Sequence, residues 1–320
     1  MSMEVGGIHH VTAIAGDPQA NVDFYSGVLG LSLVKVTVNY DDPQTYHLYY
    51  GDELGRPGTI FTFFPWPGAP RGRTGTGQVT VTAFAIPDGS VGFWADSLKA
   101  HKVEYIGPSR RFDEEVITLQ DPDGLHLELV TSRGTHDTNP RPDGSIPGKC
   151  AIQRFQGVTV AVEGYERTAG LLTTTLGMRE VGAKGNRFRY TVGDAGAPAF
   201  VDLFCLPSGQ GGRVAVGTVH HIAWRTPDDE TQRAWRESIA RLGYDVTPVI
   251  DRTYFHSIYF REPGGVLFEI ATDPPGFAVD EPADQLGRRL VLPSWLESSR
   301  AGLAQTLPTV RGPEGQRFPS

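Results

Sequence analysis

The chain carries the stretch Ile8-His9-His10-Val11-Thr12-Ala13-Ile14 near its start and a related stretch, Val219-His220-His221-Ile222-Ala223-Trp224, in its last third. Each stretch has the pattern of a β-strand, and each is followed by a helical pattern, over about residues 18–29 and 228–242, that closes at a glycine. Further strand patterns follow each helix, near residues 31–38, 46–51 and 59–64 in the first case and near 245–250, 254–261 and 266–271 in the second. A unit that is repeated within one chain determines its architecture.

Two further copies of this unit lie between them in a less clear form. Their first strands are predicted at 79–86 and 155–162, their helices at 89–100 and 165–176, and their closing strands at 125–131 and 199–205. The sequence therefore predicts an α+β fold of four βαβββ modules, at about residues 6–66, 77–133, 152–206 and 217–273.

A single module of this kind leaves the apolar face of a half-open sheet uncovered, so modules must pair. Pairing curls the sheets into cupped half-barrels, whose inward-pointing residues can hold a metal. Along the chain we expect an N-terminal pair of modules over 6–133, a Pro- and Gly-rich linker over 134–151, and a C-terminal pair over 152–273. Residues 274–320 form a tail with one short amphipathic helix near 295–303.

The composition excludes several classes of protein. The 320 residues are 39% hydrophobic and carry a net charge of −8 without a cluster of Lys and Arg, so no nucleic-acid partner is expected. No window reaches the ~20 apolar residues that span a bilayer, and no signal peptide is visible, so we expect no membrane partner and a cytoplasmic location. Cys150 and Cys205 are far apart and predict neither a disulfide framework nor a thiolate metal site.

Four of the nine histidines form two His-His pairs at the same place in the first and last modules. Adjacent side chains on a strand point to opposite faces, so one histidine of each pair can enter a given cup, and the pattern leaves open which one. A lone strand histidine is usually a packed or surface residue, but two pairs in register favour a metal site. The others lack this pattern, and we expect packing or surface positions for His47, His256, His101 and His136.

The last module also places a carboxylate, Glu269, in an otherwise apolar closing strand. A buried, unpaired carboxylate is costly, so Glu269 requires a cation or strong donors. If the hairpin is symmetric about Gly264, Tyr259 lies across from Glu269 and faces the same cup. Two imidazoles and one carboxylate form the facial triad of iron(II) oxygenases, with open positions for substrate and dioxygen.

The other modules serve as internal controls for this ligand set. Thr80 and Gly157 stand at the places that correspond to His10, so the middle modules lack the histidines. In the first module the place of Glu269 is taken by about Thr62. The sequence therefore predicts three protein ligands and no fourth.

Several segments together resemble the vicinal oxygen chelate superfamily, which includes glyoxalases, bleomycin-resistance proteins and extradiol dioxygenases. The resemblance covers about residues 7–273 and is nearest to the hydroquinone-type ring-cleaving dioxygenases. It rests on residues 8–12, Tyr46-His47-Leu48-Tyr49-Tyr50-Gly51-Asp52-Glu53-Leu54-Gly55, Pro57-Gly58-Thr59, His220-His221, and Pro263-Gly264-Gly265-Val266-Leu267-Phe268-Glu269.

The resemblance implies that the metal is Fe(II), with Mn(II) as the alternative, and that the second histidine of each pair binds it, here His10 and His221, together with Glu269. It also implies a set of residues near the substrate, namely Tyr259, Arg252, Thr12, His9 and His220. One ligand then comes from the first module and two from the last, so the end modules are expected to form one cup.

The expected reaction is the cleavage of a dihydroxylated ring of the hydroquinone or catechol type, with both atoms of dioxygen incorporated, as in extradiol enzymes. Tyr259 is expected to donate a hydrogen bond at the reacting oxygen, Arg252 to stabilise developing negative charge, and His9 or His220 to move protons. The partners are a small aromatic substrate and dioxygen, and a homo-oligomer is compatible with the sequence. Two alternatives remain: a glyoxalase-like lyase or isomerase with nickel or zinc, which uses four protein ligands, and a metal-free small-molecule-binding resistance protein.

Overall fold

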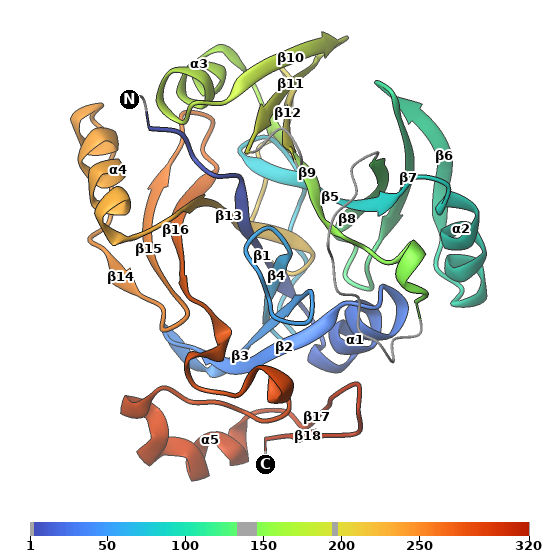
Figure 1. The fold of residues 1–320 in the computed structure, drawn as a ribbon, viewed down its shortest axis with the longest axis vertical. Coiled ribbons are helices and arrows are strands. Elements are labelled where there is room, and N and C mark those ends of the chain that lie inside the picture. Colours follow the sequence, from blue (N-terminus) through green and yellow to red (C-terminus); the bar gives the residue numbers. More distant parts are fainter. Residues whose placement is uncertain (1–2, 133–145, 194–197, 320) are drawn as a thin grey trace.

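The computed structural model describes residues 3–132, 146–193 and 198–319, and most of the predicted linker, residues 134–145, lies outside them. The helices and strands form four βαβββ modules, as predicted, and the modules combine into two eight-stranded sheets (Figure 1). Each sheet curls into a cupped half-barrel, so the predicted α+β fold class is confirmed.

The first sheet joins the two ends of the chain. Its strand order is β14-β15-β16-β13-β1-β4-β3-β2. One half of its strands comes from the first module and the other half from the last. They are β1 (Ile8–Ala15), β2 (Ser32–Asn39), β3 (Asp42–Gly51), β4 (Ile60–Pro65), β13 (Thr218–Thr226), β14 (Ile250–Asp251), β15 (Phe255–Arg261) and β16 (Leu267–Pro275). The antiparallel pairing of β1 with β13 joins the two halves at the middle of the sheet, which confirms that the end modules pair.

The second sheet joins the two middle modules, in the order β10-β11-β12-β9-β5-β8-β7-β6. Each sheet therefore takes one module from either side of the predicted linker, rather than following the division into 6–133 and 152–273. The strands are β5 (Gln78–Pro87), β6 (Tyr105–Arg111), β7 (Glu114–Gln120), β8 (His126–Ser132), β9 (Arg154–Val162), β10 (Arg179–Lys184), β11 (Arg187–Val192) and β12 (Ala199–Cys205).

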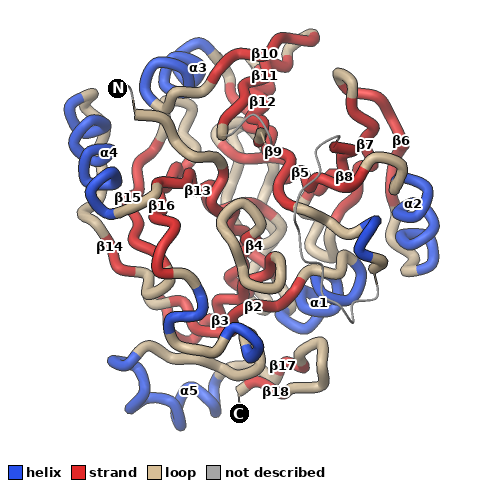
Figure 2. The backbone as a smooth tube through the Cα atoms, viewed as in Figure 1, coloured by secondary structure: helices blue, strands red, loops and turns tan. Residues whose placement is uncertain are grey.

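The helices lie at the periphery, with the strands between them (Figure 2). The carboxylate of Asp228 caps α4 by accepting from the Thr231 amide, and the buried face of this helix includes Trp235 and Ile239. The helical segments of the modules are α1 (Pro18–Val22) and the π-helix Asp23–Val28, α2 (Val91–Ala100), α3 (Glu166–Gly170) and the π-helix Leu171–Thr175, and α4 (Asp229–Arg241). None of the helices in the described part of the chain is long and apolar enough to cross a bilayer.

One predicted strand, 245–250, is largely a loop, and only β14 (Ile250–Asp251) pairs with β15. Pro248 has no amide hydrogen to donate to a ladder. Thr247 instead holds the loop beside Tyr259, through its amide to the Tyr259 carbonyl at 3.0 Å and through its hydroxyl, which accepts from the Tyr259 amide at 3.0 Å. The loop therefore follows β15 without joining the sheet.

The tail packs across the end of the first sheet, beside β2 and β3 (Figure 1). The helix predicted at 295–303 is a 3-10 turn, Ser294–Ser299, that continues as α5 (Arg300–Thr306). The buried ammonium of Lys35 anchors the tail, because its Nζ lies 2.5 Å from both Asp280 Oδ1 and Glu281 Oε2. The remaining short elements are the 3-10 turns Gly148–Cys150, Phe277–Val279 and Ala283–Gln285 and the hairpin of β17 (Val310–Arg311) and β18 (Arg317–Phe318).

Arginines fill the cup of the second sheet. The two carboxylates on its closing strands, Glu128 and Asp202, are nearly fully buried. Arg189 Nε donates to Asp202 Oδ1 at 2.7 Å, Arg187 donates to Asp202 Oδ2 at 3.0 Å, and Arg111 pairs with Glu128. Guanidinium groups therefore supply the positive charge that these buried acids require.

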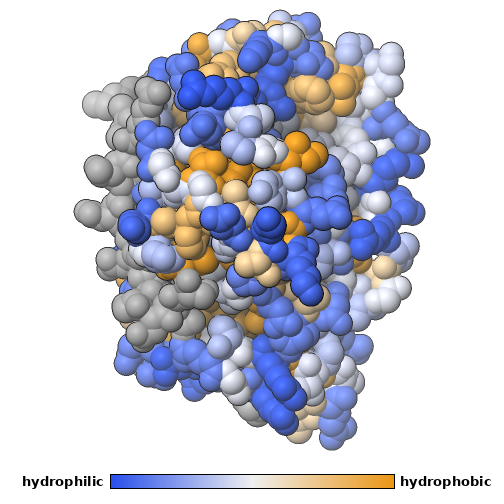
Figure 3. Space-filling model, turned by 90° about the vertical axis from the view of Figure 1, so that its right-hand side faces the viewer, coloured by the Kyte–Doolittle hydropathy of each residue, from blue (hydrophilic) through white to orange (hydrophobic). Residues whose placement is uncertain are grey.

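The face drawn in Figure 3 is mostly hydrophilic. On the face drawn in Figure 3, hydrophobic residues form small patches between hydrophilic ones rather than one continuous apolar area. Scattered patches of this size are ordinary for a folded protein.

Candidate metal centre and active-site cavity

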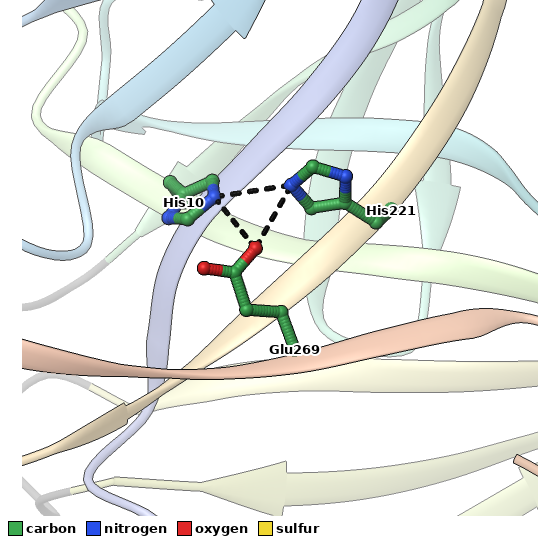
Figure 4. A group of neighbouring side chains, drawn as sticks. All are labelled: His10, His221 and Glu269. Atoms are coloured by element: carbon green, nitrogen blue, oxygen red, sulfur yellow. Dashed lines mark hydrogen bonds and ion pairs between the residues drawn. The ribbon is translucent and has the colours of Figure 1, made fainter. Parts of the chain in front are cut away.

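Three neighbouring strands of the first sheet place His10, His221 and Glu269 together (Figure 4). His10 lies on β1, His221 on β13 and Glu269 on β16. The strand register pairs Ala223 with both His10 and Glu269, so the three side chains converge on one face of the floor of the cup. The predicted metal ligands are therefore brought together from the first and last modules.

The distances between the three ligand atoms suit one metal ion. His10 Nε2 lies 3.2 Å from His221 Nε2, and Glu269 Oε2 lies 3.3 Å from the first nitrogen and 3.0 Å from the second. Three ligands that sit ~2.1 Å from a common ion at right angles to each other are ~3.0 Å apart. The observed triangle is thus close to one face of an octahedron.

Glu269 is fully buried, and its surroundings require a cation. Oε1 accepts a hydrogen bond of 2.5 Å from Ser257, whereas Oε2 has no hydrogen-bond partner in the described part of the chain despite its closeness to the imidazoles. Burial alone would raise the pKa of Glu269, but His10 and His221 hold it well below its usual range. An ionised carboxylate with one oxygen unsatisfied fits a divalent metal at this position.

β-bulges control the orientation of the two histidine pairs. In the pairing of β1 with β13, His9 is the extra residue on one strand and His220 the extra residue on the other. A bulge bends the strand and redirects the side chains beside it. Strict alternation therefore fails at both pairs, and the two rings of each pair touch through their Nδ1 atoms.

The second sheet has matching bulges at Thr80 and Gln156. Thr80 therefore corresponds to His9, and Val81 stands in the place of His10. The prediction of Thr80 at that place was wrong by one residue, because the bulge adds a residue that no sequence pattern reveals.

His9 fixes the protonation of His10. His9 Nε2 lies 3.1 Å from the Thr272 carbonyl, which can only accept, so this nitrogen carries the hydrogen. Burial, and next the nearby His10, lower the pKa of His9 far below its usual value, so the ring is neutral and its Nδ1 accepts. The 2.9 Å contact is then a hydrogen bond from His10 Nδ1, which leaves the lone pair of His10 Nε2 for the metal.

His220 does the same for His221. Their Nδ1 atoms are 2.7 Å apart, and burial lowers the pKa of His220 to about 3, so His220 is neutral. If His220 Nδ1 accepts from His221, then His221 Nε2 has its lone pair towards Glu269, and the Nε2–H of His220 is free to donate. His220 lines the cavity described next, whereas His9 does not.

A cavity of about 370 Å³ opens above the histidines. Its polar lining includes Thr12, Asn39, Asp41, His47 and Arg252. Its walls also carry six aromatic side chains, namely Tyr40, Tyr49, Phe64, Trp66, Phe255 and Tyr259. A space of this size with flat apolar walls and a few polar groups suits a single substituted ring.

Tyr259 lies directly across from Glu269 in the β15–β16 register, as the hairpin predicts. Arg252 donates through Nε to the Tyr259 hydroxyl oxygen at 3.3 Å and through a terminal nitrogen to Asp41 at 3.1 Å. Burial, and next the carboxylate of Glu269, raise the pKa of Tyr259, so it keeps its proton. The phenol is therefore a hydrogen-bond donor that faces the cavity beside a permanent cation.

For His47 the sequence predicts only a packing or surface position. In the structure His47 lines the cavity, and its Nε2 lies 2.8 Å from the hydroxyl of Thr62. Thr62 occupies the place of Glu269 in the first module, as predicted, since each follows its histidine strand in the same register. The signal that could have found His47 is its strand parity with Tyr49, which the antiparallel pairing of β3 with β4 sets opposite Thr62.

The other histidines do not reach the centre. His256 pairs with Asp229 at the surface, at 2.6 Å, and His101 contacts the Ser97 carbonyl of its own helix. His126 contacts Gln120 at 3.0 Å. His136 lies outside the described residues.

The sequence profile of the Glyoxalase/Bleomycin resistance protein/Dioxygenase superfamily matches residues 7–129 and 154–270. The chain belongs to this superfamily. The first matched stretch includes His10, and the second includes His221 and Glu269, so the superfamily match spans both parts of the metal centre.

Relatives within the superfamily match almost the whole chain. A Bacillus subtilis (strain 168) protein named "Putative ring-cleaving dioxygenase MhqO" is 50% identical over 308 residues, which cover 96% of this chain and 97% of that protein. The chlorohydroquinone/hydroquinone 1,2-dioxygenase of Sphingobium indicum is 33% identical over 309 residues, covering 95% of this chain and 96% of that enzyme.

Solved structures give the same picture of the fold. The crystal structure of a "putative dioxygenase" from Bacillus subtilis superposes with a TM-score of 0.93 at 48% identity, covering 97% of this chain and 99% of that one. Glyoxalase I from Zea mays superposes with a TM-score of 0.62 at 17% identity, covering 83% of this chain and 92% of that one. The second likeness concerns the superfamily fold alone.

Proposed function

We propose that this chain is an iron(II)-dependent dioxygenase that opens a hydroquinone-type aromatic ring. The observation that carries the proposal is the triangle of His10, His221 and Glu269 at the floor of a cavity with aromatic walls. The similarity to ring-cleaving dioxygenases, one of them a hydroquinone 1,2-dioxygenase, extends over nearly the full length of the chain and supports it.

The donor set favours iron(II), with manganese(II) as the alternative. Two imidazole nitrogens and one carboxylate oxygen on a single face leave the opposite face open. When bound there, the metal supplies adjacent open positions for a ring oxygen and dioxygen, and a path for electrons that overcomes the poor reactivity of triplet dioxygen with a closed-shell ring.

The chain's own groups then act on the ring and its charge. The Tyr259 hydroxyl donates a hydrogen bond into the cavity, and the guanidinium of Arg252 holds that hydroxyl in place. Together they stabilise negative charge as it develops on an oxygen of the substrate. The Nε2–H of His220 offers a further donor at the cavity, while Phe64, Trp66 and Phe255 confine the ring and exclude water.

The proposal includes an extradiol-type position of cleavage, in which the ring opens beside a hydroxyl-bearing carbon and both atoms of dioxygen enter the product. Turnover under ¹⁸O₂ and mass spectrometry of the product measure the incorporation of both oxygen atoms. Two labelled atoms are expected. One labelled atom would instead indicate a monooxygenase.

The decisive experiment is anaerobic reconstitution with Fe(II), Mn(II), Zn(II) or no metal, followed by dioxygen uptake with hydroquinones and catechols. We expect about one iron per chain, and uptake that depends on Fe(II) or Mn(II) and is faster with hydroquinones. Turnover of a substrate without oxygen uptake, best with zinc, would favour the glyoxalase-like lyase. Three ligands rather than four argue against that alternative, because Thr62 stands where the fourth would be.

A metal-free binding protein is the second alternative. The unsatisfied oxygen of Glu269 argues against it, since a buried carboxylate without a cation is destabilising. Elemental analysis of the purified protein decides this point, because tight ring binding with no retained metal would favour the binding protein.

A further inference from the structure

A continuous row of hydrogen bonds runs along one wall of the cavity. The Thr12 and Thr62 hydroxyls are 3.0 Å apart, His47 Nε2 lies 2.8 Å from the Thr62 hydroxyl, and the Tyr49 hydroxyl lies 2.8 Å from His47 Nδ1. Thr12, His47 and Tyr49 line the cavity, and Thr62 is fully buried behind them. We call these four residues the relay.

The relay is built on strands rather than loops. Thr12 and Thr62 are register partners in the parallel pair of β1 and β4, and Tyr49 and Thr62 are partners in the antiparallel pair of β3 and β4. His47 lies two residues before Tyr49 and so shares its face. Three adjacent strands therefore hold the four groups in fixed positions.

The hydrogen bonds of the relay have one favoured direction. Among the described residues, the buried Tyr49 hydroxyl has no acceptor other than His47 Nδ1, and burial raises the pKa of Tyr49 well above its usual value, so the phenol donates. Burial lowers the pKa of His47 well below its usual value, so its ring is neutral, and because Nδ1 accepts from Tyr49 its hydrogen lies on Nε2. Nε2 then donates to Thr62, and Thr62 donates to Thr12.

This direction leaves the hydroxyl hydrogen of Thr12 without an acceptor among the described residues. Thr12 receives one hydrogen bond from Thr62, and its own O–H lies at the cavity wall, on the same strand as His10. The lining also includes the Tyr259 hydroxyl and the Arg252 guanidinium as donors, whereas the Asp41 carboxylate at the cavity is already paired with Arg252. Thr12, Tyr259 and Arg252 can therefore all donate to an oxygen that only accepts.

We propose that the relay fixes Thr12 as a hydrogen-bond donor to an anionic oxygen of the bound ring, a phenolate, with Thr62, His47 and Tyr49 as its positioning residues. The identity of the ligand as a hydroxylated ring rests on the proposed function. A hydrogen bond to a charged oxygen is about twice as strong as one between neutral groups. A Thr12 that turned its lone pair to the same oxygen would repel it.

Binding of two matched rings to the metal-loaded protein without dioxygen tests the proposal. 4-Nitrophenolate, at a pH where it is ionised, can only accept at its ring oxygen, whereas 4-nitroanisole has the same ring without the charge. We expect Thr62→Val to weaken 4-nitrophenolate about fivefold, as measured by titration calorimetry at equal metal content. The affinity for 4-nitroanisole should change by less than about twofold, since a hydrogen bond to a neutral oxygen contributes less.

Two further variants distinguish the direction of the relay hydrogen bonds from a simple change in side-chain shape. Thr62→Ser keeps the hydroxyl and should restore the affinity for 4-nitrophenolate. Tyr49→Phe removes the donor that sets the direction, and it should weaken 4-nitrophenolate selectively, as Thr62→Val does. Equal losses for both ligands, or unchanged affinity for both in the Thr62→Val and Tyr49→Phe variants, would overturn the proposal. Because no oxygen is consumed, a failure here is distinct from a failure of the dioxygenase assay.

Discussion

His9 accepts a hydrogen bond from His10 through their Nδ1 atoms, which are 2.9 Å apart, and its Nε2 donates a second one to the Thr272 carbonyl. The first histidine of the pair thereby selects the tautomer in which the second can bind a metal through Nε2. The doubled histidine is thus a ligand together with its support, which explains why both positions are histidine in each of the two modules.

Replacing His9 with Phe should weaken iron binding. His10 Nδ1 loses its acceptor, and loss of such a supporting partner typically lowers metal affinity about 10- to 100-fold. The measurement is competition for Fe(II) against a chelator under anaerobic conditions. The surface variant His101→Gln serves as the control and should bind iron as the unaltered protein does. An affinity within twofold of the control would show that His9 does not support the ligand.

Glu269→Gln should abolish metal binding without destabilising the metal-free protein. The amide lacks the charge that holds a divalent ion, so retained metal should fall below about a tenth of an ion per chain. The metal-free variant should be as stable as the unaltered metal-free protein, or more stable by about 1 kcal/mol, because a buried charge is removed. Thermal unfolding with and without chelator checks both effects. Chelator should lower the Tm of the unaltered protein and leave that of the variant unchanged. A chelator-sensitive Tm in the variant would place the metal elsewhere.

Tyr259→Phe should lower kcat while metal content stays the same. The phenol donates to the developing charge, and removal of one such donor typically costs about 10²- to 10³-fold in kcat. Oxygen uptake at saturating substrate, with iron measured on the same samples, gives the result. Tyr46→Phe is the matched control, because its hydroxyl donates to the Pro308 carbonyl and Tyr46 does not line the cavity. Equal kcat values for the two variants would show that the Tyr259 hydroxyl does not take part in the reaction.

The buried carboxyl group of Asp121 should lower the free energy of unfolding as the pH rises from about 4 to 7. Burial raises the pKa of Asp121 to about 6, even though the amides of Leu125 and Asp123 and the Tyr25 hydroxyl donate to it. The folded protein therefore binds a proton more tightly than the unfolded chain, and this group stabilises the fold by about 2 kcal/mol at pH 4 relative to pH 7. Asp121→Asn should flatten the change in unfolding free energy between pH 4 and 7, as measured in urea. Parallel pH profiles for the two proteins would contradict the shifted pKa.

Lys35→Met should destabilise the tail. It leaves the carboxylates of Asp280 and Glu281 without their buried cation, and breaking a buried pair in this way costs about 3 kcal/mol or more. Lys99→Met, on the exposed side of α2, is the control. Adding Glu281→Gln to Lys35→Met should recover part of the loss in a urea unfolding experiment. If the single variant matched the control, the ion pairs would contribute nothing.

Much of the fold follows from sequence because its unit is repeated. The βαβββ pattern is clear in the first and last modules, and the position of Glu269 opposite Tyr259 follows from a hairpin centred on Gly264. The pairing of the end modules follows from the ligands themselves, since one metal needs all three in one place.

The features that sequence missed are the ones without a periodic pattern. Bulges at His9 and Thr80 each insert one residue, so alternation counted from the strand ends assigns the wrong faces. His47 could not be recognised, because its partners Thr62 and Tyr49 become meaningful only when β3 and β4 are in register. Likewise, Lys35 looks like an ordinary strand residue until the tail brings Asp280 and Glu281 to it.

The antiparallel contact of β1 with β13 has a consequence for synthesis. His10 leaves the ribosome early, but His221, its partner at the metal, follows 211 residues later. Domains assemble from the N-terminus during translation, and contacts of long sequence separation form late. The two middle modules can form their own sheet before β13 is available to pair with β1. A nascent chain therefore cannot complete the set of His10, His221 and Glu269 before its last module emerges.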